Sequence, residues 1–243
     1  MIRYLWLETK RQWRSRDILI FRLGLPAAIY LILIAVMEQP GGSSGSLPWE
    51  TGRMVALAGL AAVTSGLASG PSLGEERGNG WLRQLRVTPL RPSAAVGAKI
   101  AVAMSFALPA IALVAAIGGI TEGVDLSWQR WALVIGLMWI ATIPIAALGT
   151  LIGLTFRAES AQNATNLAFV TLWLLGGIFT SPSSMPDVLA AVSRTLPSWG
   201  VVEVGWSTAG QSPVPVQAIT VLVAWTAGVG SLAALAWQRV MSR

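Results

Sequence analysis

The chain has 243 residues, of which 54% are hydrophobic and only 12% are charged. An ordinary soluble domain carries about 25% charged residues, so this chain has too few charges to cover a surface in water. Its composition excludes a soluble enzyme, a disordered tail and a nucleic-acid-binding module. Together with a mean hydropathy of +0.63, it predicts an all-α protein that crosses a membrane several times.

The sequence contains no Cys and no His. The chain therefore has no disulfide, no thiolate nucleophile and no cysteine metal site. It also lacks the side chain that serves most often as a general base and as a metal ligand. We expect neither a catalytic residue nor a metal site in this chain.

The first segment, residues 1–17, is polar and basic. Its apolar residues recur at helical spacing on one side, and its basic residues recur on another. This pattern predicts an amphipathic helix that lies in the membrane interface. A cleaved secretory signal is disfavoured, because the charges continue to Arg16 and the apolar stretch that follows is too long.

Six apolar runs follow, and each except the fifth is long enough to cross a hydrocarbon core about 30 Å thick. Five of them cover approximately residues 18–37, 54–73, 94–118, 131–156 and 216–237. The fifth in chain order begins near Asn166 and loses its apolar character at Ser181 and Pro182. Because lipid offers the backbone no hydrogen-bond partner, each run is predicted to be helical.

Basic residues set the expected orientation. With six spans, one side of the membrane receives 14 of the 17 Lys and Arg residues, and the other receives only Arg53, Arg130 and Arg194. Cytoplasmic loops of membrane proteins carry the excess of Lys and Arg. The sequence therefore predicts a multi-pass protein of the plasma membrane with both termini in the cytoplasm. The net charge of +6 then meets lipid headgroups rather than nucleic acid.

Glycines recur at four-residue spacing within two runs, at Gly66, Gly70 and Gly74 and at Gly149 and Gly153. Such spacing lets helix backbones approach each other closely. Packing within one protomer is the favoured interpretation, and a seam between two copies is the alternative.

The sequence holds no G-x-x-x-x-G-K-[ST] motif, so the chain has no ATP-binding P-loop of its own. The apolar runs are nearly devoid of ionisable residues, which disfavours a transporter coupled to protons or sodium. An intramembrane protease is disfavoured as well, because no His is present to activate a nucleophile. Transport against a gradient would therefore draw its energy from another chain.

The segment between the second and third runs, residues 75–92, is the most distinctive. Trp81, Leu82 and Leu85 would share one side of a short helix that Thr88 and Pro89 end. Such an element suits a groove on a soluble partner. A basic loop that only sets topology is the alternative, and these residues alone leave the two interpretations equal.

The pattern Glu76-Arg77-x-x-Gly80-x-Leu82-x-x-Leu85-x-x-Thr88-Pro89-Leu90, followed by Lys99, resembles the signature of type-two ATP-binding-cassette (ABC) exporter permeases. The resemblance extends over nearly the whole chain. It implies a single permease domain, residues 1–243, with a cytoplasmic interfacial helix at 1–17 and a cytoplasmic coupling loop at 75–92. It also implies a re-entrant outer hairpin at 181–212, between spans five and six. The Gly78-Asn79 pair before Gly80 departs from the family pattern.

The resemblance implies roles for particular residues. Contact with an ATPase is implied for Glu75, Glu76, Arg77, Gly80, Trp81, Leu82, Leu85, Thr88 and Pro89. A substrate path along spans two and five is implied for Thr64, Ser65, Thr171, Trp173, Leu174 and Leu175. Core packing or lipid contact suits Trp173 and the leucines equally well. Asn163 and Asn166 would meet substrate or, as we favour, cap the start of a helix.

The implied function is that of the membrane subunit of an ATP-driven exporter. ATP and Mg²⁺ would be bound by a partner ATPase, and a second permease copy, identical or related, would complete the path. Because the lining carries no charge, we expect an amphipathic or hydrophobic cargo such as a drug, an antimicrobial peptide or a lipid, with a polysaccharide as a further option. The alternatives are a membrane sensor or scaffold that transports nothing, and an unfuelled channel, which the lack of a polar stripe disfavours.

Overall fold

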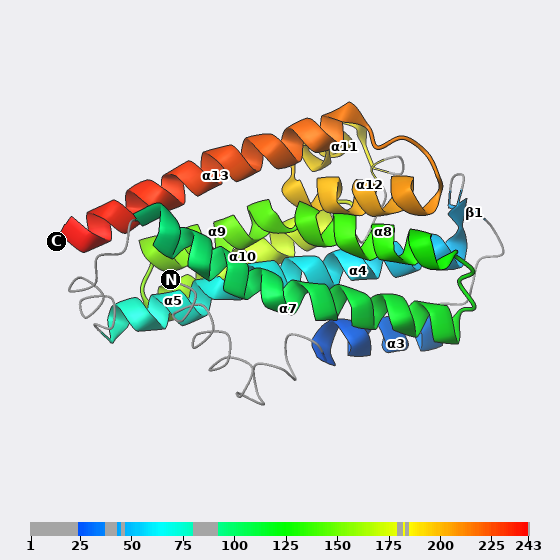
Figure 1. Cartoon of the computed structure of the whole chain (residues 1–243), viewed down its shortest axis with the longest axis horizontal. Helices are drawn as coiled ribbons and strands as arrows, with labels where there is room; N and C mark the ends of the chain where they lie inside the picture. The colour runs from blue at the N-terminus through cyan, green and yellow to red at the C-terminus, as the bar shows by residue number, and fades with distance from the viewer. Residues whose placement is uncertain are drawn as a thin grey trace.

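The computed structural model describes residues 24–36, 43–44, 47–79, 92–178, 182 and 185–242. The interfacial helix expected at residues 1–17 and the first part of the first apolar run lie outside the described residues. Apart from one two-residue strand pair, the regular structure of the described residues is helical, as the composition predicts. Figure 1 shows the long helices gathered along the long axis of the molecule.

The elements follow the chain order of the apolar runs. They are α3 (Leu25–Val36), β1 (Ser43–Ser44), β2 (Leu47–Pro48), α4 (Trp49–Leu67), α5 (Ser69–Gly78), α7 (Pro92–Thr121), α8 (Trp128–Ala141), α9 (Ile143–Thr155), α10 (Ala158–Leu175), α11 (Asp187–Ser193), α12 (Pro197–Ala209) and α13 (Val216–Ser242). Strands β1 and β2 pair antiparallel, with Ser43 opposite Pro48 and Ser44 opposite Leu47.

Four stretches of helix are long and apolar enough to cross a membrane. They are Trp49–Gly78, Ala95–Thr121, Trp128–Thr155 and Val216–Val240. They correspond to the second, third, fourth and sixth predicted spans. Of the first span, the structure describes the shorter apolar helix Leu25–Ala35. Helix α10, in the place of the fifth span, has too polar a first half to meet the same criterion, so the described residues do not establish six spans.

The helix formed by α4 and α5 is the centre of the bundle. Of its most apolar 18-residue stretch, 83% is buried. It packs along α7 on one side and along α9, α10 and α12 on others. Figure 1 shows α3 against the face of α7 that lies away from α13, and α13 along the outside of the bundle. Only 17% of the most apolar 18-residue stretch of α13 is buried inside the protomer.

Glycine contacts explain how the central helix fits among its neighbours. A Cβ atom built on Gly149 would lie 2.9 Å from the carbonyl oxygen of Gly66, and one built on Gly153 would lie 2.6 Å from that of Gly70. A Cβ atom on Gly74 would lie 2.5 Å from the Cβ of Ala161. The predicted small-residue seams therefore join α4 and α5 to α9, and α5 to α10, within one protomer, which confirms the favoured interpretation.

The central helix is interrupted at Ala68, and the fourth span is interrupted at Thr142. Pro144 follows the second interruption and has no N–H to donate to the carbonyl four residues earlier. The two interruptions lie close together, since a Cβ on Gly66 would touch the side chains of both Thr142 and Ile145. Directly after the interruption at Ala68, the Ser69 hydroxyl forms a hydrogen bond of 3.3 Å with the Thr150 hydroxyl of α9.

Two further helices, α11 and α12, follow the end of α10. Helix α12 returns into the bundle against α4 and α8, and its residues Trp199, Val201 and Val202 are buried. The Trp206 indole donates a hydrogen bond to the carbonyl oxygen of Gly52, at the start of α4. The segment predicted as an outer hairpin thus contains two short helices, the second of which is part of the core.

Candidate functional site

The last turn of α5 holds three of the residues expected to contact an ATPase. Glu75 is exposed, Glu76 is buried and Arg77 is half-buried. The structure shows that the helix continues to Gly78 before a turn at Asn79. The first four residues of the predicted 75–92 loop are therefore helical, because the last turn of α5 is held by its packing on α9 and α10. Gly80, Trp81, Leu82, Leu85, Thr88 and Pro89 lie outside the described residues.

Glu76 forms an ion pair with Lys99, near the start of α7. The Lys99 ammonium donates to both carboxylate oxygens of Glu76, at 2.8 and 2.7 Å. The two side chains are only 5% and 4% exposed. A buried charge is tolerated when a partner and hydrogen bonds compensate its lost hydration, and this pair supplies both.

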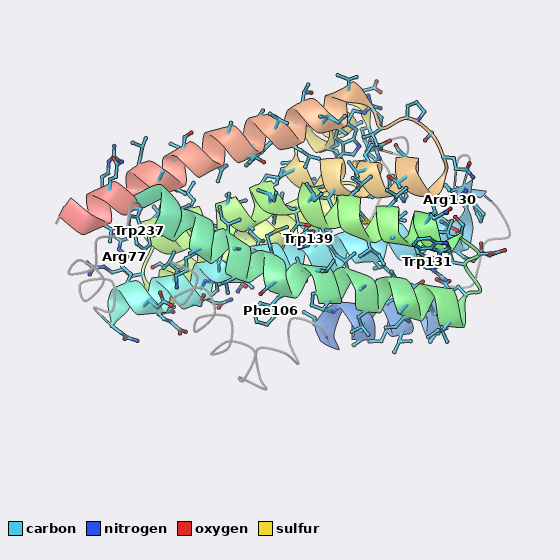
Figure 2. The ribbon with its side chains drawn as sticks, in the orientation of Figure 1. Arg77, Phe106, Arg130, Trp131, Trp139 and Trp237 are labelled. Atoms are coloured by element: carbon cyan, nitrogen blue, oxygen red, sulfur yellow. The ribbon has the colours of Figure 1, made fainter. Side chains whose placement is uncertain are left out.

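Arg77 ties the same turn to a different helix. Its guanidinium donates to the carbonyl oxygen of Leu154, in the last turn of α9. The last four carbonyl groups of a helix have no partner within it and carry the negative end of its dipole, so a cation is favoured there. Figure 2 places Arg77 at the end of the bundle where Trp237 also lies. We call this end, which is built by residues 73–79, 95–99 and 154–161, the Lys99 end.

The substrate-path residues of α4 differ in their environment. The Thr64 hydroxyl is half-buried and donates to the carbonyl oxygens of Leu60 and Ala61, both at 3.0 Å. Ser65 is fully buried, and its hydroxyl has no hydrogen-bond partner within the part of the chain that the structure describes. A buried hydroxyl without a hydrogen-bond partner lowers stability, so Ser65 is an unfavourable polar group within the buried central helix.

The substrate-path residues of α10 lie on more than one side of that helix. Trp173 packs against the main core and stacks on Phe169, with ring centroids 6.2 Å apart and planes 13° apart. Leu174 is 43% exposed, and the Thr171 hydroxyl donates to the carbonyl oxygen of Leu167. Leu175 is half-buried. Although α4 and α10 are in contact, the structure does not gather these six residues on one surface: Ser65 is buried, Trp173 packs against the core and Leu174 is exposed.

The outward side of α10 is polar near its start and apolar near its end. Its exposed residues include Gln162, Asn163, Asn166, Leu167, Val170 and Leu174. The Gln162 amide donates to the Asn166 side-chain oxygen at 2.9 Å. Because α10 begins at Ala158, both Asn163 and Asn166 stand inside the helix, and the prediction that they cap its start is wrong. The first two turns are too polar to show as part of an apolar run.

At the opposite end of the bundle, three residues form a second buried charged cluster. Arg53 of α4 pairs with Glu122, just after α7, and their side chains are 6% and 1% exposed. The fully buried Tyr30 of α3 donates its hydroxyl to the same carboxylate. Arg53 is one of the three basic residues predicted on the outer side, and its partner could not be predicted because Glu122 lies 69 positions away in the sequence. We call this end the Arg53 end.

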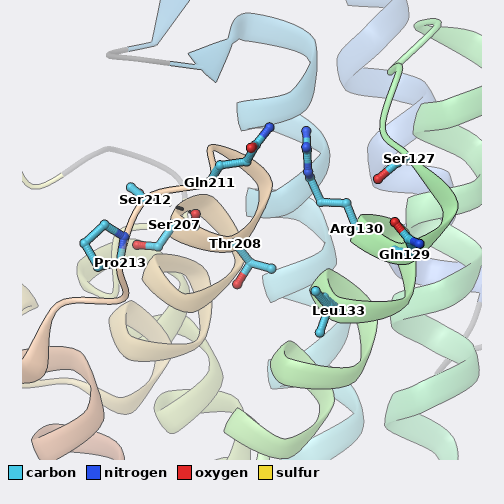
Figure 3. A pocket seen from close by; sticks show the side chains of 9 residues that line it. All are labelled: Ser127, Gln129, Arg130, Leu133, Ser207, Thr208, Gln211, Ser212 and Pro213. Atoms are coloured by element: carbon cyan, nitrogen blue, oxygen red, sulfur yellow. Dashed lines mark hydrogen bonds between the residues drawn. The ribbon is translucent and has the colours of Figure 1, made fainter.

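A cavity of about 550 Å³ opens at the Arg53 end between α8 and α12. Figure 3 shows its lining, Ser127, Gln129, Arg130, Leu133, Ser207, Thr208, Gln211, Ser212 and Pro213. With its amide oxygen turned toward Arg130, Gln211 accepts from that guanidinium at 3.0 Å. The lining includes none of the substrate-path residues, so the sequence did not point to this cavity.

Glu203 lies on the half-buried side of α12. Burial raises the pKa of its carboxyl group above the ordinary value of 4.5, while the Arg194 guanidinium and a hydrogen bond from Ser207 act in the opposite direction.

Comparisons with known proteins identify the family of the chain. Residues 2–204 match the model of the family described as ABC-2 type transporter. The chain is also 27% identical over 210 residues to YvfS of Bacillus subtilis (strain 168), which is provisionally named a transport permease. The matched region covers 85% of this chain and 84% of that protein. The resemblance seen in the coupling segment is thereby confirmed, and the chain belongs to the ABC-2 type transporter family as a membrane domain.

Proposed function

We propose that this chain is the membrane subunit of an ATP-driven exporter whose ATP and Mg²⁺ are held by a separate ATPase. The family match over residues 2–204 carries this proposal. Because the sequence lacks a P-loop motif, the nucleotide chemistry belongs on a partner chain.

In this proposal the Lys99 end faces the cytoplasm, with both termini on that side of the plasma membrane. The excess of Lys and Arg assigned to this side supports the orientation. The coupling segment 75–92 meets the ATPase there, with exposed Glu75 at its start. The ties of Glu76 and Arg77 to α7 and α9 give the ATPase a mechanical connection to the bundle.

A second permease copy, identical or related, pairs through the outward side of α10 and encloses the path. Exposed Asn163 and Asn166 would be costly against lipid, so a protein or cargo contact suits them better. Leu167, Val170 and Leu174 continue the same side as an apolar surface. This mixture suits an amphipathic or hydrophobic cargo, such as a drug, an antimicrobial peptide or a lipid. Helices α11 and α12 would form the re-entrant outer hairpin.

Co-purification tests the proposal. The tagged chain should retain an ATPase when it is produced in its native cells and extracted in mild detergent. Leu82→Asp with Leu85→Asp should release that ATPase, because both changes put a charge on the apolar side of the predicted short helix. The matched control is Gln84→Asp, which adds a charge in the same segment off that side and should leave the complex intact. Retention of the ATPase by the double variant would contradict the assigned contact.

Transport decides between an exporter and a non-transporting sensor or scaffold. Inside-out vesicles containing the complex should take up a fluorescent amphipathic dye when ATP is supplied, and a fluorescent phospholipid and a labelled cationic peptide test the other cargo classes. An intact, ATP-hydrolysing complex that moves none of these probes supports the sensor or scaffold.

A further inference from the structure

The base of the coupling segment is closed by the ion pair between Glu76 and Lys99. Glu76 stands in the last turn of α5, and Lys99 stands in the second turn of α7, so the two residues flank the segment that joins these helices. The joining segment is connected to both helices through the main chain, and the ion pair ties the two helix ends to each other beside it. Helix ends frayed from each other would absorb a force on this segment, whereas a buried, bidentate pair holds them at one separation.

The pairing at the opposite end ties α4–α5 to α7 a second time. Arg53 precedes Glu76 by 23 positions, and Lys99 precedes Glu122 by the same 23 positions. Because the two helices are antiparallel, the Arg53–Glu122 pair closes the far end of the unit that the Glu76–Lys99 pair closes at the near end. The glycine seams then pack this unit against α9 and α10.

Resting on the proposed function, we infer that Lys99 is a positioning residue for ATP-driven movement. It holds the last turn of α5 against α7, so that a displacement of the coupling segment moves α7 as far as its distant end. Arg77 contacts α9 through the carbonyl oxygen of Leu154, so the same displacement also acts on a second helix. Loss of the Lys99 charge would loosen the tie between α5 and α7, so that the same displacement of the coupling segment moves the distant end of α7 less.

The lack of cysteine in the chain allows a direct test. Ile120, in the last turn of α7, is 83% exposed, so Ile120→Cys places one reactive thiol at the Arg53 end. The rate at which a maleimide-polymer reagent shifts this chain on a gel is measured in the purified complex with its ATPase, without nucleotide and with ATP plus vanadate. We expect a severalfold difference between the two states, and loss of that difference in Lys99→Met and Glu76→Gln.

Rescue separates positioning from mere stability. The exchanged pair, Glu76→Lys with Lys99→Glu, should restore the nucleotide-dependent difference, as should Lys99→Arg. The matched control is Trp139→Phe, which removes the hydrogen bond from the Trp139 indole to the carbonyl oxygen of Met104, another tie to α7, and should keep the difference. If Lys99→Met fails to assemble, Glu76→Gln with Lys99→Met, which removes both charges of this ion pair, replaces it.

The two proposals fail in different ways. An assembled Lys99→Met complex that hydrolyses ATP and keeps the wild-type labelling difference overturns the role of Lys99 and leaves the exporter proposal standing. A chain that binds no ATPase overturns the proposed function itself.

Discussion

Gly153 of α9 lies so close to Gly70 of α5 that a Cβ atom on Gly153 would stand 2.6 Å from the Gly70 carbonyl oxygen. Carbonyl oxygens cannot rotate aside as a side chain does, so this contact requires glycine. It places the backbone of α5, just before the coupling segment, directly on α9.

Gly153→Val should therefore destabilise the protein strongly. Overpacking a fitted site costs about 1–3 kcal/mol, and here the obstacle is main chain. The measurement is the temperature at which the detergent-solubilised chain loses its monodisperse peak in size-exclusion chromatography. Gly136→Ala is the control, since nothing lies within 4 Å of a Cβ at that position. It should leave the temperature equal or slightly higher, because Ala favours helix over Gly by up to about 1 kcal/mol.

Arg53→Met should lower stability by about 3–5 kcal/mol, because it leaves the Glu122 carboxylate buried without its cation. The double variant Arg53→Met with Glu122→Leu should recover most of the loss, since it removes both charges. The same thermal assay measures this coupling as a double-mutant cycle. Equal losses in the single and double variants would show that the side chains matter through packing rather than through charge.

A second copy on the outward side of α10 predicts specific crosslinks. Leu174→Cys, the only cysteine in its chain, should join two copies when membranes are treated with a short bifunctional maleimide. Val223→Cys is the comparison: Val223 is 61% exposed and lies on α13, the least buried of the four candidate membrane-spanning helices that the structure describes. A covalent dimer from Val223→Cys and none from Leu174→Cys would move the interface to α13.

Glu203 predicts a pH-dependent stability. Its folded-state pKa is raised, chiefly by burial, so the folded state binds the proton more tightly than the unfolded chain. Stability is then greatest below the ordinary value of 4.5 and decreases as the pH rises through the folded-state pKa. Glu203→Gln should raise the unfolding temperature at pH 8 and change it less at pH 5. If the Glu203→Gln variant is less stable at both pH values, the interactions of the carboxylate with Arg194 and Ser207 outweigh the cost of its burial.

The apolar runs predicted where most of the long helices lie, because lipid solvation demands long apolar segments whatever their partners. The ends were less predictable. Helix α10 begins at Ala158 rather than near Asn166, since its polar first turns are held by packing on α5, through contacts such as Gly74 with Ala161. Long-range pairing was hidden as well. Arg53, Glu122 and Lys99 each resemble an ordinary interfacial charge at the end of a run, and only the folded chain shows which charge meets which.

The equal spacing of the two ion pairs also carries a dimension. With a rise of about 1.5 Å per residue, 23 positions of helix separate the pairs by about 35 Å. Hydrocarbon cores are about 30 Å thick, and an excess of a few ångströms is accommodated by a small tilt. The distance between the two ion pairs therefore matches a hydrocarbon core of ordinary thickness. In lipids with much longer acyl chains, one of the two pairs would lie inside the hydrocarbon core.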